Sequence, residues 1–153
     1  MTESIKKWAT AGDPNAMIKL ADIYLAEGKT DEAKKFLAQA AEENYRPAAM
    51  KLAKIFHAEG NLPETVTFYK KATELGDVEA MDALIKLCAD DKETLNFVLE
   101  NINKRYDDIY NADMGRVFFF GSIRKEEYTP QYGAAVERRR IKNTILQLKA
   151  KEA

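Results

Sequence analysis

The sequence has one cysteine, one histidine and two serines, and these small numbers exclude most catalytic machinery. Cys88 has no second cysteine with which to form a disulfide inside the chain, which fits a reducing compartment. A serine or cysteine triad needs a nucleophile, a histidine and an acid in register, and Ser4, Ser122 and His57 do not supply that set. Zinc or iron sites need several histidine, cysteine or paired carboxylate ligands, and no such spacing occurs. We therefore predict no enzyme activity, no metal and no cofactor.

Charge of one sign and long apolar runs are also lacking. The chain has 24 basic and 25 acidic residues and a net charge of −1, so it exerts no strong overall field on nucleic acid or membrane. No run approaches the roughly 18 apolar residues of a membrane span, and residues 1–7 have no apolar segment of a leader. Hydrophobic residues make up 46% of the chain, which is too apolar for disorder. We expect a cytoplasmic protein with no membrane partner.

Glycine is sparse, but it recurs in a pattern that reveals internal repeats. The segment 12–17, GDPNAM, returns 64 residues later as 76–81, GDVEAM, and a degenerate copy, NYRPAA, lies halfway at 44–49. The 32-residue register continues, because the KLA of residues 19–21 matches the KLA of residues 51–53. Repetition at a period of 20 to 50 residues is typical of stacked units that bury their apolar faces against one another.

Apolar spacing within each repeat predicts two helices. In the first repeat we expect helices at about 14–27 and 30–43, separated by Gly28, which supplies the left-handed turn that ends a helix. We expect Thr30 or Asp31 to cap the second of these helices.

The repeats predict an all-α fold, an α-α superhelix (solenoid) of antiparallel helix pairs that forms a single domain over residues 1–153. The run at 117–123 is rich in aromatic and β-branched residues, which leaves a β-strand as an alternative there. Near the N-terminus, Ile5, Trp8 and Ala9 share one helical face. The predicted units are a half repeat at 3–12, repeats at about 13–44 and 45–76, a degenerate repeat at 77–104, and a last repeat at 108–151 that includes a C-terminal capping helix on the stripe Ala134, Ile141, Ile145 and Leu148.

The junctions between repeats carry a family resemblance. The segments 40–48, AAEENYRPA, and 71–80, KATELGDVEA, resemble the alanine-alanine-glutamate, glycine, alanine junction of Sel-one-like repeats, and 114–121 resembles the family's leucine-glycine, tyrosine, glycine segment. Leu20 and Ala21, with Tyr24 and Gly28, are closer to the related tetratricopeptide repeat. The resemblance implies an α-solenoid scaffold or adaptor that holds a protein or peptide in its concave groove, and it implies no chemistry.

The predicted binding residues lie on the first helix of each pair, which lines the groove in the resembled repeats. Two positions after each packing leucine or methionine stands a charged residue, and three of these four are basic. With Lys51 and His57 beside them, they could hold an acidic segment or a terminal carboxylate. The alternative is that they are ordinary exposed lysines. The predicted groove residues are Asp22, Leu25, Lys51, Lys54, His57, Lys86, Arg116 and Phe119.

Two further functions remain open from the sequence. The run Phe118–Phe120 spans about 200° of a helix and cannot all face one core. One of its rings must be covered by the C-terminal helix of the same chain or by another chain, and in the second case the run and the C-terminal helix could form a homo-oligomer. The C-terminal cluster of Arg138, Arg139, Arg140 and Lys142 could contact phosphate or an acidic surface, which would associate the protein with nucleic acid. The alternative for this cluster is a solvated face of the capping helix.

Overall fold

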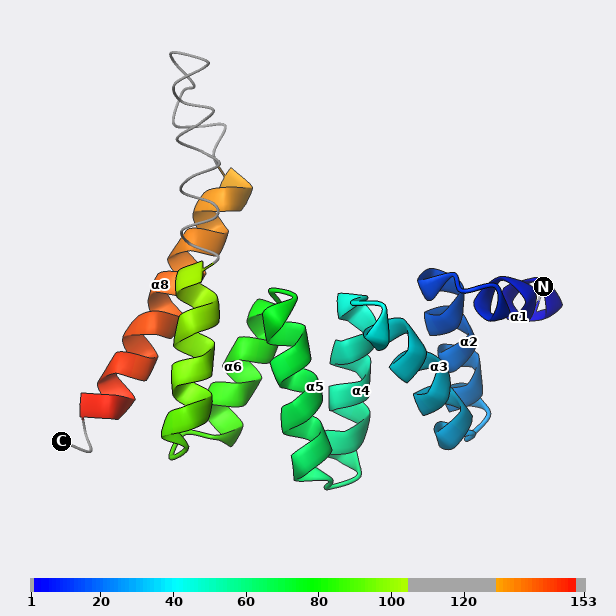
Figure 1. Ribbon diagram of the computed structural model, residues 1–153, viewed down its shortest axis with the longest axis horizontal. Coiled ribbons are helices and arrows are strands. Elements are labelled where there is room, and N and C mark those ends of the chain that lie inside the picture. The colour runs from blue at the N-terminus through cyan, green and yellow to red at the C-terminus, as the bar shows by residue number, and fades with distance from the viewer. Residues whose placement is uncertain (1, 105–128, 151–153) are drawn as a thin grey trace, which may run out of the picture. The chain divides into compact units, whose positions relative to one another are not determined.

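The computed structural model describes residues 2–104 and 129–150, apart from the side chains of 129–138 (Figure 1). Every regular element in these ranges is an α-helix and none is a strand, which confirms the all-α, helical-repeat solenoid class. The chain divides into two compact units, Met1–Ala80 and Met81–Ala153, called unit 1 and unit 2. The helices are α1 (Thr2–Thr10), α2 (Pro14–Ala26), α3 (Thr30–Glu42), α4 (Arg46–Ala58), α5 (Leu62–Glu74), α6 (Val78–Leu87), a helix over 92–104, and α8 (Thr129–Ala150).

The helices of unit 1 pack in the order of the chain. Helix α1 lies on α2, α2 on α3, α3 on α4 and α4 on α5. Within the pairs α2–α3 and α4–α5 the two helices run antiparallel (Figure 1). Helices α2 and α4 are therefore the first helices of successive pairs, α3 and α5 are the second helices, and α1 occupies the place of a second helix.

One turn geometry ends the first five helices. After α2, Gly28 has φ +74°, its N–H donates to the carbonyl of Leu25, and the N–H of Lys29 donates to the carbonyl of Tyr24. The same pair of bonds closes α1, α3, α4 and α5, as in the Schellman motif. At the end of α3 the left-handed residue is Asn44, with φ +61°, because Asn is the residue that best replaces glycine there. This repeated turn fixes the antiparallel reversal.

The predicted cap of α3 is wrong. The N-cap residue is Lys29, which makes no capping hydrogen bond through its side chain, and Thr30 is already helical. The reason is the position of the turn. Gly28 has the left-handed conformation, Lys29 is the only residue between it and the helix, and Thr30 is the first helical residue. Lys29 instead donates to the carboxylate of Glu27 at 2.7 Å, and Asp31 lies in the first turn, where the helix dipole favours a carboxylate.

An aromatic stack at the same register joins the two helices of each pair in unit 1. Tyr24 on α2 stacks on Phe36 of α3 with ring centroids 5.9 Å apart, and 32 residues later Phe56 on α4 stacks on Phe68 of α5 at 5.5 Å. Below the rings the core consists of small and aliphatic residues that also repeat. The residues of the first pair that are at most 1% exposed are Met17, Leu20, Ala21, Ala33, Leu37, Ala40 and Ala41.

Unit 2 contains the end of α6, the helix 92–104 and α8. Asp91 starts the helix 92–104, because its carboxylate accepts from the N–H of Glu93 and from the hydroxyl of Thr94. Apolar residues of the helix face inward, as the sequence predicts: Leu95, Val98 and Ile102 are at most 2% exposed.

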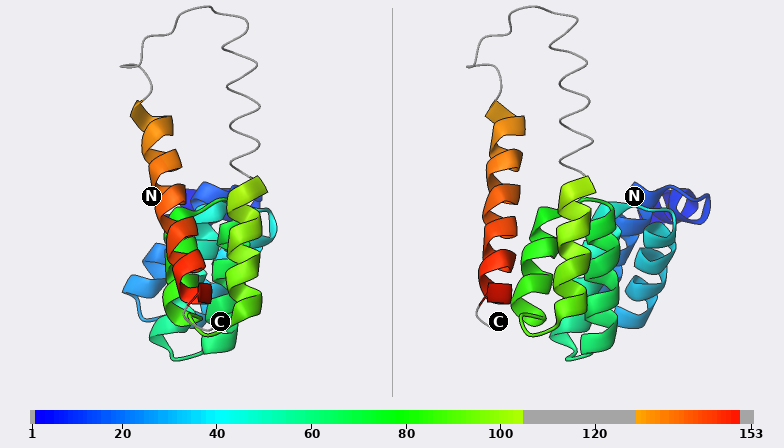
Figure 2. Two further views of the ribbon diagram at one scale, coloured as in Figure 1. Left: turned by 90° about the vertical axis from the view of Figure 1, so that its left-hand side faces the viewer. Right: turned by 60° about the vertical axis from the view of Figure 1, so that its left-hand side comes forward.

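Helix α8 packs on both of the other helices of unit 2 (Figure 2). Arg140 pairs with Asp82 of α6 at 2.6 Å, and Lys149 donates to Asn96 of the helix 92–104. Ile141 and Ile145 are fully buried, which matches their place on the predicted stripe; Leu148, the next member, is half-buried. In the part of the chain that the structure describes, no helix is long and apolar enough to cross a lipid bilayer.

Candidate functional site: an inter-repeat seam

Charged side chains cross from the first helix of one repeat to the first helix of the next. We call this row the seam, and it consists of Asp22 on α2, Lys51 and Lys54 on α4, and Glu79 at the start of α6. The seam belongs to unit 1. The buried residues of α2 and α4 are all apolar, and Asp22 and Lys54 occupy exposed positions on these helices. Asp22 and Lys54 share one position in the 32-residue register, whereas their partners Lys51 and Glu79 do not.

Two ion pairs hold the seam together. Lys51 on α4 pairs with Asp22 on α2, and Lys54 on α4 pairs with Glu79 on α6 at 2.8 Å. The side chains of Lys54 and Glu79 are 55% and 69% exposed. Water screens the attraction between such exposed charges, so the pair contributes about 0.2–1 kcal/mol to the free energy of unfolding. Each pair links a charge on one repeat to an opposite charge on the next.

The pKa of Lys54 is raised by its partner in the seam. The hydrogen bond to Glu79 raises the pKa of the Lys54 ammonium, partly opposed by burial and aided by the charge of Glu79. An ammonium group has three N–H donors, and Glu79 accepts from one of them. Lys54 therefore retains donors that can bind a second carboxylate from outside the chain.

The structure brings some predicted groove residues together and leaves others apart. Asp22, Lys51 and Lys54 are joined in the seam, and the exposed His57 lies one turn beyond Lys54 on α4. Leu25 is half-buried on α2, and Lys86 is exposed on the part of α6 that belongs to unit 2. Arg116 and Phe119 lie outside the described residues. Binding of a partner by these residues stays a prediction.

The C-terminal basic cluster is divided by the structure. Arg140 is engaged with Asp82, whereas Arg139 and Lys142 are exposed on α8. The side chain of Arg138 and the run Phe118–Phe120 lie outside the described residues, so nucleic-acid binding and homo-oligomerisation stay predictions.

Another link between repeats, outside the seam, was not expected from the sequence. Lys34 on α3 pairs with Glu59, which ends α4, at 2.9 Å, and its ammonium lies 5.3 Å from the ring centroid of Phe56. The hydrogen bond to Glu59 raises the pKa of Lys34, with burial acting against it. The only signal in the sequence is the opposite charge of two residues 25 positions apart, and nothing in the 32-residue register connects them.

Within the described residues there is no group of three or more histidine, cysteine or carboxylate side chains that could hold a metal ion. Chemically, the side chains of the seam can form ion pairs and hydrogen bonds.

Comparison with known families agrees with this geometry. Residues 9–55 match the tetratricopeptide repeat family, a stretch that runs from the end of α1 through α2 and α3 into α4. These residues form a tetratricopeptide-type repeat. Tetratricopeptide-type repeats generally mediate protein–protein interaction and scaffolding, and α2 and α4 are the first helices of such a repeat and of the next. The chain has no significant match among curated protein sequences or among solved structures.

Proposed function

We propose that this protein is a non-enzymatic, cytoplasmic adaptor of the Sel-one-like subtype, which binds an acidic peptide or protein segment along the first helices of its repeats. The observation that carries the proposal is the seam, where cations on α4 stand exposed on a surface that neighbouring repeats hold in register. Side chains that are already positioned lose less conformational entropy when a partner binds.

Acidic chemistry is the best fit for the partner. Lys54 has N–H donors that Glu79 does not use, and the exposed His57 and Lys86 carry no carboxylate partner among the described residues. A carboxylate bound to any one of these groups makes charge-assisted hydrogen bonds, which are roughly twice as strong as neutral ones. A segment with carboxylates spaced along it would therefore follow the first helices.

The decisive experiment is affinity capture followed by mass spectrometry, with binding of the captured partner then measured by calorimetry. The variant Lys54→Glu with Lys86→Glu should lose the partner. Because Lys54 pairs with Glu79, this loss alone could come from repulsion between repeats. The control is therefore the exchange Lys54→Glu with Glu79→Lys, which keeps an ion pair between α4 and α6 but moves the cation.

The two variants separate a structural from a binding role. If Lys54 contacts the partner, the Lys54→Glu, Glu79→Lys variant should unfold at the same urea concentration as the wild type. Its affinity for the partner should nevertheless be at least about tenfold weaker. Full binding by the exchanged pair would show that the seam serves only to join repeats, and the proposal would be withdrawn.

A further inference from the structure

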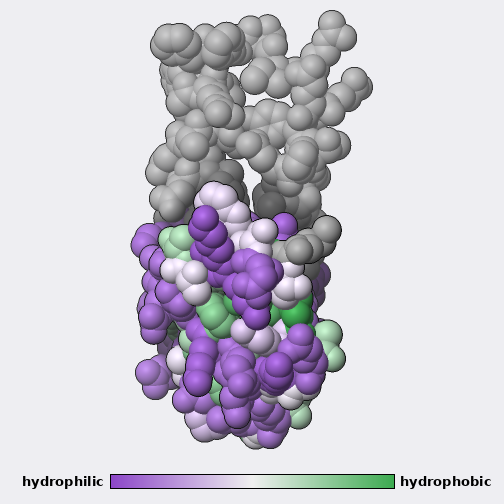
Figure 3. Space-filling model, turned by 90° about the vertical axis from the view of Figure 1, so that its right-hand side faces the viewer, coloured by the Kyte–Doolittle hydropathy of each residue, from purple (hydrophilic) through white to green (hydrophobic). Residues whose placement is uncertain are grey.

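The end of unit 1 that carries α1 has an open, partly apolar surface. Its residues surround a depression of about 280 Å³, and on this face a small hydrophobic patch lies among hydrophilic residues (Figure 3). The tryptophan there is 61% exposed, the most exposed large hydrophobic residue among those described. We call this region the end surface, and it is lined by Ile5, Trp8, Asp13, Asn15, Ala16 and Lys19.

The repeat register explains why Trp8 is exposed. The residues at its register in the next two second helices are Ala40 on α3 and Ala72 on α5, and both are fully buried. Helix α3 packs between α2 and α4, whereas α1 packs on α2. Ala9, the neighbour of Trp8, is buried on the α2 side, as Ala41 is buried in α3. Among the described residues, no helix covers Trp8 in the way that α2 and α4 together cover the equivalent face of α3.

The charges of the end surface follow the same register. Lys19 on α2 stands where Lys51 stands on α4, and Lys51 pairs with Asp22 on the preceding first helix. Lys19 has no carboxylate partner among the residues that the structure describes. At the register where Lys51 pairs with Asp22, the ammonium of Lys19 is therefore available to a carboxylate.

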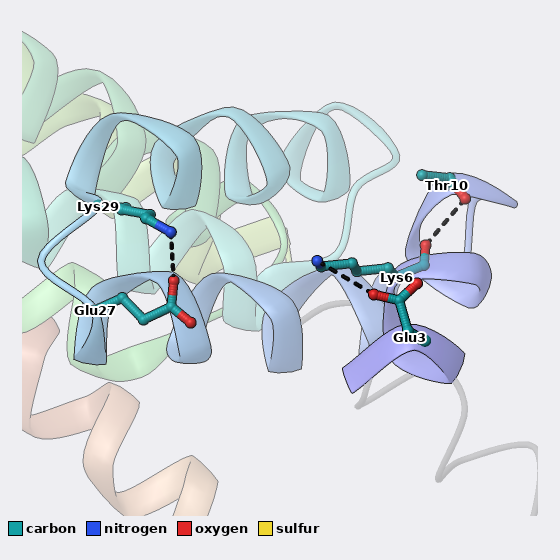
Figure 4. A network of polar contacts seen from close by, with 5 residues as sticks. All are labelled: Glu3, Lys6, Thr10, Glu27 and Lys29. Atoms are coloured by element: carbon teal, nitrogen blue, oxygen red, sulfur yellow. Dashed lines mark hydrogen bonds and ion pairs between the residues drawn. The ribbon is translucent and has the colours of Figure 1, made fainter. Parts of the chain in front are cut away.

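The nearby Lys6 does not play this part, because its charge is already compensated (Figure 4). Lys6 pairs with Glu3 at 3.5 Å. Its charge also helps to lower the pKa of Glu27, after the larger effects of the hydrogen bond and charge of Lys29. Lys19 is therefore the cation of the end surface that lacks an acid.

We propose that the end surface docks an amphipathic helix of a partner protein, which places apolar residues on Trp8 and a carboxylate on Lys19. Helix α2 is the template for this ligand. It buries Met17 and Leu20, stacks Tyr24 on α3, and presents Asp22 to the lysine of the next first helix. The docked helix would repeat this spacing, with apolar residues three and four apart and an acid two positions after the second.

A second copy of this chain is a poorer occupant. The template face of α2 is already occupied within each copy, because Met17 and Leu20 are at most 1% exposed and Asp22 pairs with Lys51. A partner helix with an acid in the Asp22 position instead completes the charge pattern.

The test uses a stapled peptide with the sequence of residues 13–29, because a free peptide of this length is only marginally helical. Trp8 is the only tryptophan of the chain, so its fluorescence reports on this surface directly. We expect saturable binding with a blue shift of Trp8 emission. Trp8→Ala, followed by fluorescence anisotropy of a labelled peptide, should weaken binding about tenfold or more, as for a buried interface tryptophan.

Charge exchange tests the register itself. Lys19→Glu should weaken binding of the wild-type peptide about fivefold, the upper range for an exposed ion pair, and a peptide with Asp22→Lys should recover affinity for that variant. Matched controls are Leu62→Ala, which removes another exposed apolar side chain, and Lys35→Glu, which reverses another exposed lysine. Both should bind as the wild type does.

Several results would overturn the proposal. One is the absence of any change in Trp8 emission with the stapled peptide. Another is equal binding of the wild-type and Asp22→Lys peptides. A blue shift that grows with protein concentration alone, together with a dimer in light scattering, would assign the end surface to a second copy.

Discussion

The substitution Leu52→Ala should remove a large share of the stability of unit 1. Leu52 is 1% exposed on α4, the helix that packs against both α3 and α5. The change deletes three carbon atoms, and at about 0.8 kcal/mol for each the loss of burial comes to about 2.4 kcal/mol. The cavity left between three helices adds to this, so we expect a decrease of about 3–4 kcal/mol in the free energy of unfolding.

Urea unfolding followed by far-ultraviolet circular dichroism would measure the decrease, with Leu62→Ala as the matched control. Leu62 is the same residue type at the start of α5 and is 54% exposed, so its truncation should cost less than about 1 kcal/mol. Equal losses for the two variants, or a loss below about 1 kcal/mol for Leu52→Ala, would refute the packing described above.

Three further predictions concern single features of unit 1. Thr73→Val should raise stability by about 1 kcal/mol in urea unfolding, because the buried Thr73 hydroxyl has no hydrogen-bond partner among the described residues. Gly28→Ala should cost about 1 kcal/mol and Gly28→Asn less, since φ is +74° and no atom crowds a new Cβ; equal Tm values would contradict this. The hydrogen bond to Glu59 raises the pKa of Lys34 above 10.5 in the folded chain. The contribution of the Lys34 ammonium to the free energy of unfolding is therefore complete below pH 10.5 and is lost as the pH rises through the folded pKa. Lys34→Met should accordingly lose less stability than the wild type in urea unfolding between about pH 9 and pH 11.5.

The sequence predicted the helices and the turns between them well because their signals are local. Each turn needs a residue that tolerates positive φ, and glycine or asparagine recurs at the required register. Asn44 takes that conformation where the neighbouring turns use glycine, so the degenerate copy in the sequence is a true copy of the backbone. The apolar spacing then places Leu20 and Leu52 inward.

The environment of each residue could not be predicted in the same way. Periodicity puts Trp8 and Ala9 on one helical face, but only the arrangement of neighbours decides that Ala9 is covered and Trp8 is open. Likewise the sequence placed Lys54 on the surface without revealing Glu79, because the partner lies at a register position that varies between repeats. The sequence pattern thus predicts the helical face on which a side chain lies. Which neighbouring residues contact that side chain depends on how the helices pack.

The most direct test of the central claim is site-specific photo-cross-linking of the captured partner. A photoreactive residue in place of His57 lies beside the seam on α4, whereas one in place of Lys35 lies exposed on α3, a second helix. We predict that a partner segment rich in carboxylates cross-links at position 57 and not at position 35. Cross-links from position 35 alone would show that the partner binds the second helices, which contradicts the account.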